Sequence, residues 1–137
     1  MSVPAAKVYA ETDELMRQMG DHVGEEMMKR LLPVVRAEPH SLLIGRLVVA
    51  SARIAHGPDG PRRVDELIKA ADQAPGDALA NFIAGVAAHY RGHGHGTTRE
   101  AKSADYKRTI RLLRRAEEEL GHAPRLWIYL AVSYYRT

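Results

Sequence analysis

The sequence predicts an all-α fold of about seven short helices in one domain. Apolar residues recur with a period of about 3.6, as Val64, Leu67 and Ile68 illustrate, and this is the period of an amphipathic helix. No segment alternates apolar and polar residues for the length of a strand. Glycine and proline fall between the periodic segments, as in HGPDGP at 56–61 and APGD at 74–77, so they mark the turns between helices.

Size and composition restrict the class of protein. The chain of 137 residues has the length of one domain, and 45% hydrophobic with 27% charged residues is typical of a globular protein. Cysteine is absent, which excludes disulfide bonds, a Cys nucleophile and a thiolate zinc site. The longest apolar segment contains Arg46 and is shorter than the roughly 20 residues of a membrane span, and the N-terminus does not resemble a secretory signal. We therefore expect a cytoplasmic protein that does not enter a membrane.

The N-terminal region, 11–39, supports two interpretations. A turn sequence at 20–24, an apolar stripe and the terminal Pro39 are together typical of a degenerate helix hairpin. The same residues also fit one long capping helix. Pro33 lacks an amide hydrogen, so we expect it to kink or end a helix near Leu32.

The following helices form pairs with a recurring pattern. In WIYLAVSYY, Trp127, Leu130 and Tyr134 have the order W-x-x-L-A-x-x-Y. This order resembles the first helix of a tetratricopeptide repeat, whose unit has about 34 residues and continues with A-x-x-x-F-x-x-A and a helix-ending Pro. The units that match are 44–77, 78–121 and the first helix of a truncated unit, 124–137.

This resemblance implies a right-handed α-solenoid of antiparallel helix hairpins that acts as a protein–protein interaction module or adaptor. Small residues occupy the places where the helices of such a hairpin approach closely: Ala50, Ser51, Ala84, Gly85, Ala116 and Ala131. Larger residues are expected to fill the space between the helices: Leu67, Leu113, Trp127 and Tyr134. The sequence departs from the family pattern at Asn81, where Trp is usual, and at Arg63, where Ala is usual.

An insertion, RGHGHGTTREAKSA at 91–104, interrupts the second unit. It is a surplus of about 12 residues over the regular repeat, and its glycines favour a surface loop. His89, His93 and His95 lie in or beside it and could supply three nitrogen ligands to zinc, nickel or copper. His22 falls in an equivalent turn, so a metal-responsive protein with a histidine-rich edge is one alternative function.

The family binds partner peptides or helices on a concave surface formed by the first helix of each unit. Carried over by register, this surface comprises Val48, Ala52, Ala55, His56, Leu79, Phe82, Val86, His89, Tyr90, Arg125, Ile128, Val132, Tyr135 and Arg136. Phe82, Tyr90 and Tyr135 are the expected apolar anchors, with Arg125 and Arg136 at the rim. Alternatively, the same surface is covered by the N-terminal helix, by a further C-terminal helix, or by a second copy of the chain in a homodimer.

Other classes of function have less support in the sequence. It contains no phosphate-binding G-x-x-x-x-G-K-[ST], no G-x-S-x-G and no H-E-x-x-H, so we expect neither an enzyme nor a cofactor. Residues 101–137 hold eight basic and four acidic side chains. The acidic run at 117–119 follows the basic stretch on the same helix, so nucleic-acid binding is not expected. A chaperone that holds a hydrophobic segment of a secreted client is a further alternative for the same groove.

Overall fold

The computed structural model describes residues 5–18, 22–94 and 97–137, and within these ranges it confirms the all-α prediction. The described residues are 85% helical and contain no strand. Its helices are α1 (Ala5–Gln18), α2 (Val23–Ala37), α3 (Ser41–His56), α4 (Gly60–Gln73), α5 (Ala78–Gly92), α6 (Arg99–Leu120) and α7 (Pro124–Arg136). In the part of the chain that is described, none of these helices has the length and apolar character needed to cross a membrane.

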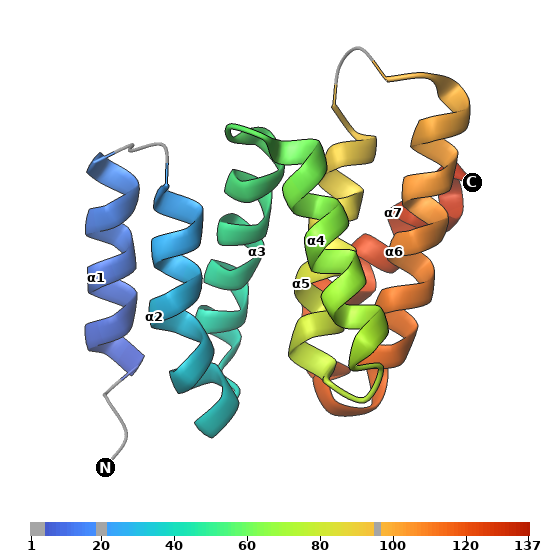
Figure 1. Ribbon diagram of the computed structural model, residues 1–137. Coiled ribbons are helices and arrows are strands. Elements are labelled where there is room, and N and C mark those ends of the chain that lie inside the picture. The colour runs from blue at the N-terminus through green and yellow to red at the C-terminus, as the bar shows by residue number, and fades with distance from the viewer. Residues whose placement is uncertain (1–4, 19–21, 95–96) are drawn as a thin grey trace.

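Consecutive helices run in opposite directions and lie side by side (Figure 1). The C-terminal ends of α1, α3 and α5 lie at one end of the molecule, and those of α2, α4 and α6 lie at the other (Figure 1). The odd-numbered helices also contact one another, since α3 packs against both α1 and α5, and α5 packs against α7. The molecule is therefore a row of helix pairs in which one helix of each pair touches its counterpart in the next.

Polar side chains at the turns set where several helices begin. The Asp77 carboxylate accepts a hydrogen bond from the Ala80 amide at 3.2 Å at the start of α5. The Thr98 hydroxyl accepts one from the Ala101 amide at 3.1 Å at the start of α6. These contacts satisfy amide groups that have no partner inside the helix.

The N-terminal region forms a helix hairpin, α1 and α2, and the alternative of one long capping helix is wrong. Of the two outcomes expected at Pro33, a kink or a helix end near Leu32, the helix end is wrong, because α2 continues past Pro33 to Ala37. Val34 is 8% exposed and Val35 is fully buried, so both contribute to the core. Burial of apolar side chains beyond the proline offsets the hydrogen bond that the proline cannot donate.

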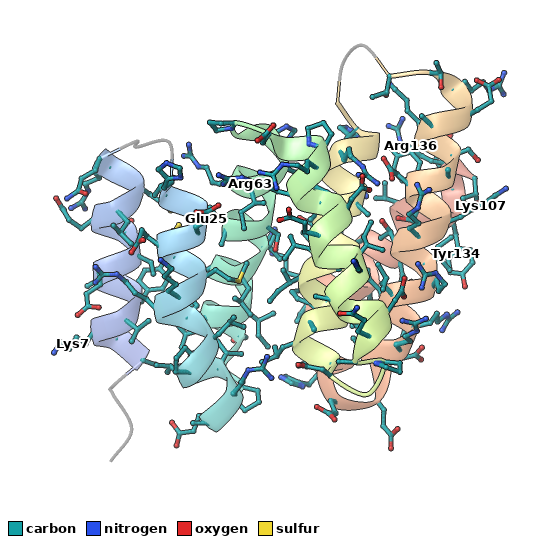
Figure 2. The ribbon with its side chains drawn as sticks, viewed as in Figure 1. Lys7, Glu25, Arg63, Lys107, Tyr134 and Arg136 are labelled. Carbon is teal, nitrogen blue, oxygen red and sulfur yellow. The ribbon has the colours of Figure 1, made fainter. Side chains whose placement is uncertain are left out.

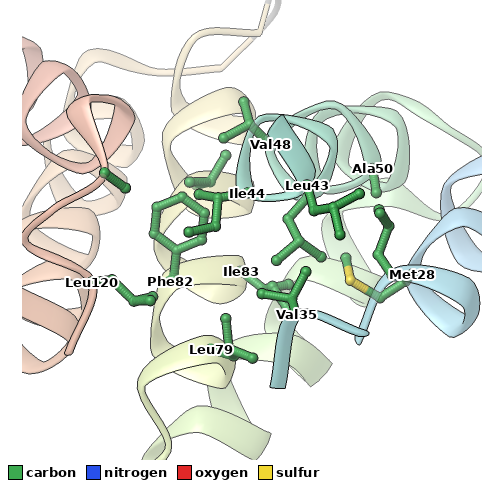
Figure 3. Packing of buried hydrophobic residues seen from close by; sticks show 14 of the residues in the cluster. Met28, Val35, Leu43, Ile44, Val48, Ala50, Leu79, Phe82, Ile83 and Leu120 are labelled. Carbon is green, nitrogen blue, oxygen red and sulfur yellow. The ribbon is translucent and has the colours of Figure 1, made fainter. Parts of the chain in front are cut away.

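The core is centred on α5, which is buried over most of its length. Phe82 lies beside Ile44 and Val48 of α3 and faces Leu120 at the end of α6 (Figure 3). The close approach of α5 and α6 depends on Gly85, because a Cβ there would lie 2.9 Å from Cδ2 of Leu113. This confirms the packing role expected of the small residue at this position.

The other residues expected at helix contacts differ in how far they are buried. Ala50, Ser51, Ala84 and Ala116 are fully buried, as expected for close helix contacts. Trp127 is 43% and Tyr134 is 49% exposed, so the prediction that these two residues fill space between helices is wrong. Ala131 is exposed, so the close helix contact expected at this small residue is wrong as well. Among the described residues, no further helix packs against this face of α7.

The segment 91–104 is mostly helical, so the loop prediction was too long. Helix α5 extends to Gly92 and α6 begins at Arg99. Asp105 of α6 is 4% exposed and accepts hydrogen bonds from Arg91 of α5, the shortest at 2.8 Å. Arg91 also binds Asp65 of α4 at 2.6 Å. This buried charge network joins three helices and extends α5 and α6 into what the sequence indicated as a loop.

Candidate functional site

A groove lies along α3, with a lining that also includes residues of α2, α5 and α7. It has a volume of about 560 Å³. Its lining consists of Val23, Gly45, Val48, Val49, Ala52, Arg53, His56, Gly57, Pro58, Tyr90 and Arg125. A smaller hollow of about 230 Å³ shares Gly45, Val49 and Arg125 and continues toward Ser41 and Tyr9. The two hollows together follow α3 for its whole length.

The groove has an apolar floor and a basic rim. Val48, Val49 and Ala52 form the floor, and the cations that line the groove are the guanidinium groups of Arg53 on α3 and Arg125 on α7. No acidic side chain lines it within the described residues. A negatively charged group next to an apolar segment would therefore find partners of the opposite sign here.

Gly45 lies in the middle of α3 and faces the groove. A Cβ built at this position has no heavy atom within 4 Å, so packing inside the protein does not require glycine there. Glycine in a helix interior costs about 1 kcal/mol relative to alanine. An open, backbone-exposed helix surface allows a bound segment to approach α3 closely.

The end of the groove is closed by aromatic rings. Tyr90 of α5 lines it, with the His56 ring edge-to-face at 5.8 Å between ring centroids. The Tyr90 hydroxyl is 2.6 Å from the Tyr129 hydroxyl of α7. This hydrogen bond fixes the Tyr90 ring between α3 and α7, so the apolar surface that it offers to the groove is rigid.

Behind Tyr90 lies His89, which is 5% exposed. Its ring packs edge-to-face on Tyr129 at 4.8 Å and stacks on His93 at 5.6 Å. Burial, and then the positive charges of His93 and Arg136, lower the pKa of His89 from 6.5 to about 4. His89 is therefore a neutral part of the core near pH 7.

Five of the residues expected in the groove do line it: Val48, Ala52, His56, Tyr90 and Arg125. Four others are buried in the core: Leu79, Phe82, Val86 and His89. Ala55 is also buried, at 8% exposure. Phe82 is fully buried, so it cannot anchor a partner, and its assignment as an anchor is wrong.

The sequence of α5 contains the signal that these residues are buried. Its run ALANFIAGVAA is apolar on every face, and such a helix is surrounded by protein. In the structure α5 contacts α3, α4, α6 and α7, so little of it remains for a partner.

The remaining expected groove residues belong to α7 and lie outside the groove. Ile128 is 53% and Tyr135 is 89% exposed, and Val132 is partly exposed. Tyr135 and Arg136 line a separate cleft between α6 and α7. The expected concave surface is therefore divided into a groove on α3 and a different surface on α7.

The histidines do not form a metal centre in the part of the chain that the structure describes. No group of three or more His, Cys, Asp or Glu side chains there is arranged to hold a metal ion. His93 Nδ1 is 3.0 Å from the Tyr106 hydroxyl. His95 lies outside the described residues. His22 precedes α2, His56 ends α3 and His93 follows α5. The start of α2 and the ends of α3 and α5 lie at the same end of the molecule (Figure 1).

Comparisons with protein family models, with curated proteins and with solved structures found no match for this chain.

Proposed function

We propose that the protein is a right-handed helical solenoid of the tetratricopeptide type, and that it acts in the cytoplasm as a non-enzymatic protein-interaction module. Three features support this proposal. The helices pair as antiparallel hairpins, and the odd-numbered helices contact their counterparts. The buried small residues lie at the helix contacts where the repeat pattern has them, as Gly85 illustrates against Leu113.

The observation that carries the functional part of the proposal is the groove on α3, with an apolar floor, a basic rim and no acidic lining residue among those described. Its occupant is a segment of another protein that presents apolar side chains and at least one carboxylate. The apolar side chains lie on Val48, Val49 and Ala52 beside the Tyr90 ring, and the carboxylate pairs with Arg125.

Gly45 adds a second argument for an occupant. The position accepts a side chain without a clash, yet it has glycine at a cost in helix stability. Close approach of a bound segment to the α3 backbone gives this glycine a role.

The test uses a library of random peptides, each about as long as α3, displayed on phage and selected on the purified protein. We expect the selected peptides to share apolar residues and an Asp or Glu. A synthetic peptide with the shared sequence should then lose at least about tenfold in affinity for the Gly45→Leu variant, which fills the groove without disturbing the core.

The matched control is Ala70→Leu, which adds the same side chain to an exposed position on α4. This variant should bind the peptide as the parent does. Selection of no shared sequence, or equal binding by Gly45→Leu and the parent, would contradict the proposal. If the Arg125→Gln variant prefers acidic peptides as strongly as the parent does, Arg125 does not pair with the partner's carboxylate.

A further inference from the structure

A second cleft lies between the first half of α6 and the end of α7. Its volume is about 500 Å³, close to that of the groove. Three cationic side chains line it, Arg99 and Lys102 from α6 and Arg136 from α7. The other lining residues are His93, Ser103, Tyr106, Tyr135 and Thr137. Residues from three separate parts of the chain therefore meet there.

The cations in this cleft differ from most arginines of the molecule. Most of the guanidinium groups pair with acids, as Arg111 does with Asp72 and Arg114 with Glu117. Arg99, Lys102 and Arg136 have no ion-pair partner among the described residues, and no acidic side chain of that part of the chain lines the cleft. Three positive charges around one hollow repel one another, and a bound anion would relieve this repulsion.

Hydroxyl groups and a helix end add to the preference for an anion. The Tyr106 hydroxyl is held 3.0 Å from His93 Nδ1, and Tyr106 is 3% exposed, so its position is fixed by the core. Ser103, one turn before Tyr106 on α6, supplies a second hydroxyl. Arg99 is the first residue of α6, so the cleft lies at the positive end of this helix's dipole.

We propose that this cleft binds a phosphate monoester, with Arg99, Lys102 and Arg136 around the dianion and Ser103 and Tyr106 as hydroxyl donors. Arginine and lysine are the side chains that proteins use for this group, since they offer several charged donors to its oxygens. The cleft is larger than a phosphate group, so it also has room for the part of the ligand that carries the phosphate. A nucleotide and a phosphorylated serine both present this chemistry, and the cleft is separate from the groove on α3.

The test is isothermal titration calorimetry of the full chain with inorganic phosphate, AMP and phosphoserine, and with acetate as a monoanion control. We expect binding of all three phosphates with dissociation constants that rise with salt, and at least about tenfold weaker binding of acetate. Tighter binding of AMP than of phosphoserine would indicate a nucleotide, and the reverse order would indicate a phosphorylated side chain. Each of these results supports the proposal.

The variant is the double substitution Lys102→Gln, Arg136→Gln, and the matched control is Lys107→Gln. Lys107 projects from the exposed side of α6 (Figure 2) and is not part of the cleft. The double variant should lose at least about tenfold in phosphate affinity at an unchanged melting temperature, and the control should keep the parent's affinity. No heat of binding from any phosphate, equal binding of acetate, or equal losses in the variant and the control would overturn the proposal.

Discussion

Acidification should destabilise the protein through one buried residue, His89. The pKa of His89 is about 4 in the folded protein, against 6.5 for an ordinary histidine. Between these values the unfolded chain binds a proton at this position and the folded protein does not. Stability from this residue is therefore complete above about pH 6.5 and falls as the pH decreases toward 4.

The magnitude follows from the gap between the two pKa values. At about 1.4 kcal/mol for each pKa unit, the change from 6.5 to about 4 corresponds to about 3 kcal/mol. This is a large part of the roughly 5–15 kcal/mol that holds a typical domain in its folded state.

The assay is urea unfolding, followed by circular dichroism, at several pH values between 7.5 and 4. The control variant is His89→Phe, which keeps an aromatic ring against Tyr129 and Tyr90 but cannot bind a proton. All other side chains are the same in the two proteins, so the difference between parent and variant isolates His89. We expect the parent to lose about 3 kcal/mol more than the variant over this range. Equal losses in the two proteins would refute the assignment of His89 as a neutral core residue.

Two further comparisons test the packing described above. Asp105→Ala should lower the free energy of unfolding by about 3 kcal/mol, because it removes a carboxylate that is 6% exposed and leaves the mostly buried Arg91 with the exposed Asp65 as its remaining ion-pair partner. Asp72→Ala removes a carboxylate that is 41% exposed and pairs with two arginines, and it should cost less than about 1 kcal/mol. Similar losses in urea unfolding would contradict the account of the buried network. Gly45→Ala should raise stability by about 1 kcal/mol, while Gly85→Ala should lower it, since its new Cβ meets Leu113 at 2.9 Å. If the melting temperatures of Gly45→Ala and Gly85→Ala change in the same direction, the two glycines do not differ in the space they leave for a Cβ.

Helix content and turn positions could be predicted from the sequence because they depend on local patterns. The turns at 56–61 and 74–77 separate α3, α4 and α5 as the glycines and prolines indicated. The extent of α6 could not be predicted in this way. In its first turns, Asp105 accepts hydrogen bonds from Arg91 of α5. This contact between two helices outweighs the local preference of a glycine-rich and polar segment for a loop.

The candidate site was predicted in part. Val48, Ala52 and Tyr90 line the groove as the repeat register indicated, because α3 exposes one face. Phe82 was misplaced because the same register was applied to α5, although that helix is apolar all round and packed on every side. The cleft with Arg99 and Arg136 could not be found from the sequence, since it forms only when the start of α6 meets the end of α7.

Mapping the bound peptide on the protein tests most directly whether the groove on α3 is the binding site. Backbone amide signals are recorded by NMR while the phage-selected peptide is added to the isotope-labelled chain. We expect the largest changes in amide signals at residues that line the groove on α3: Gly45, Val49, Ala52 and Tyr90. Changes confined to α7 or to the outer faces of α2 and α4, with the α3 signals unmoved, would contradict this expectation.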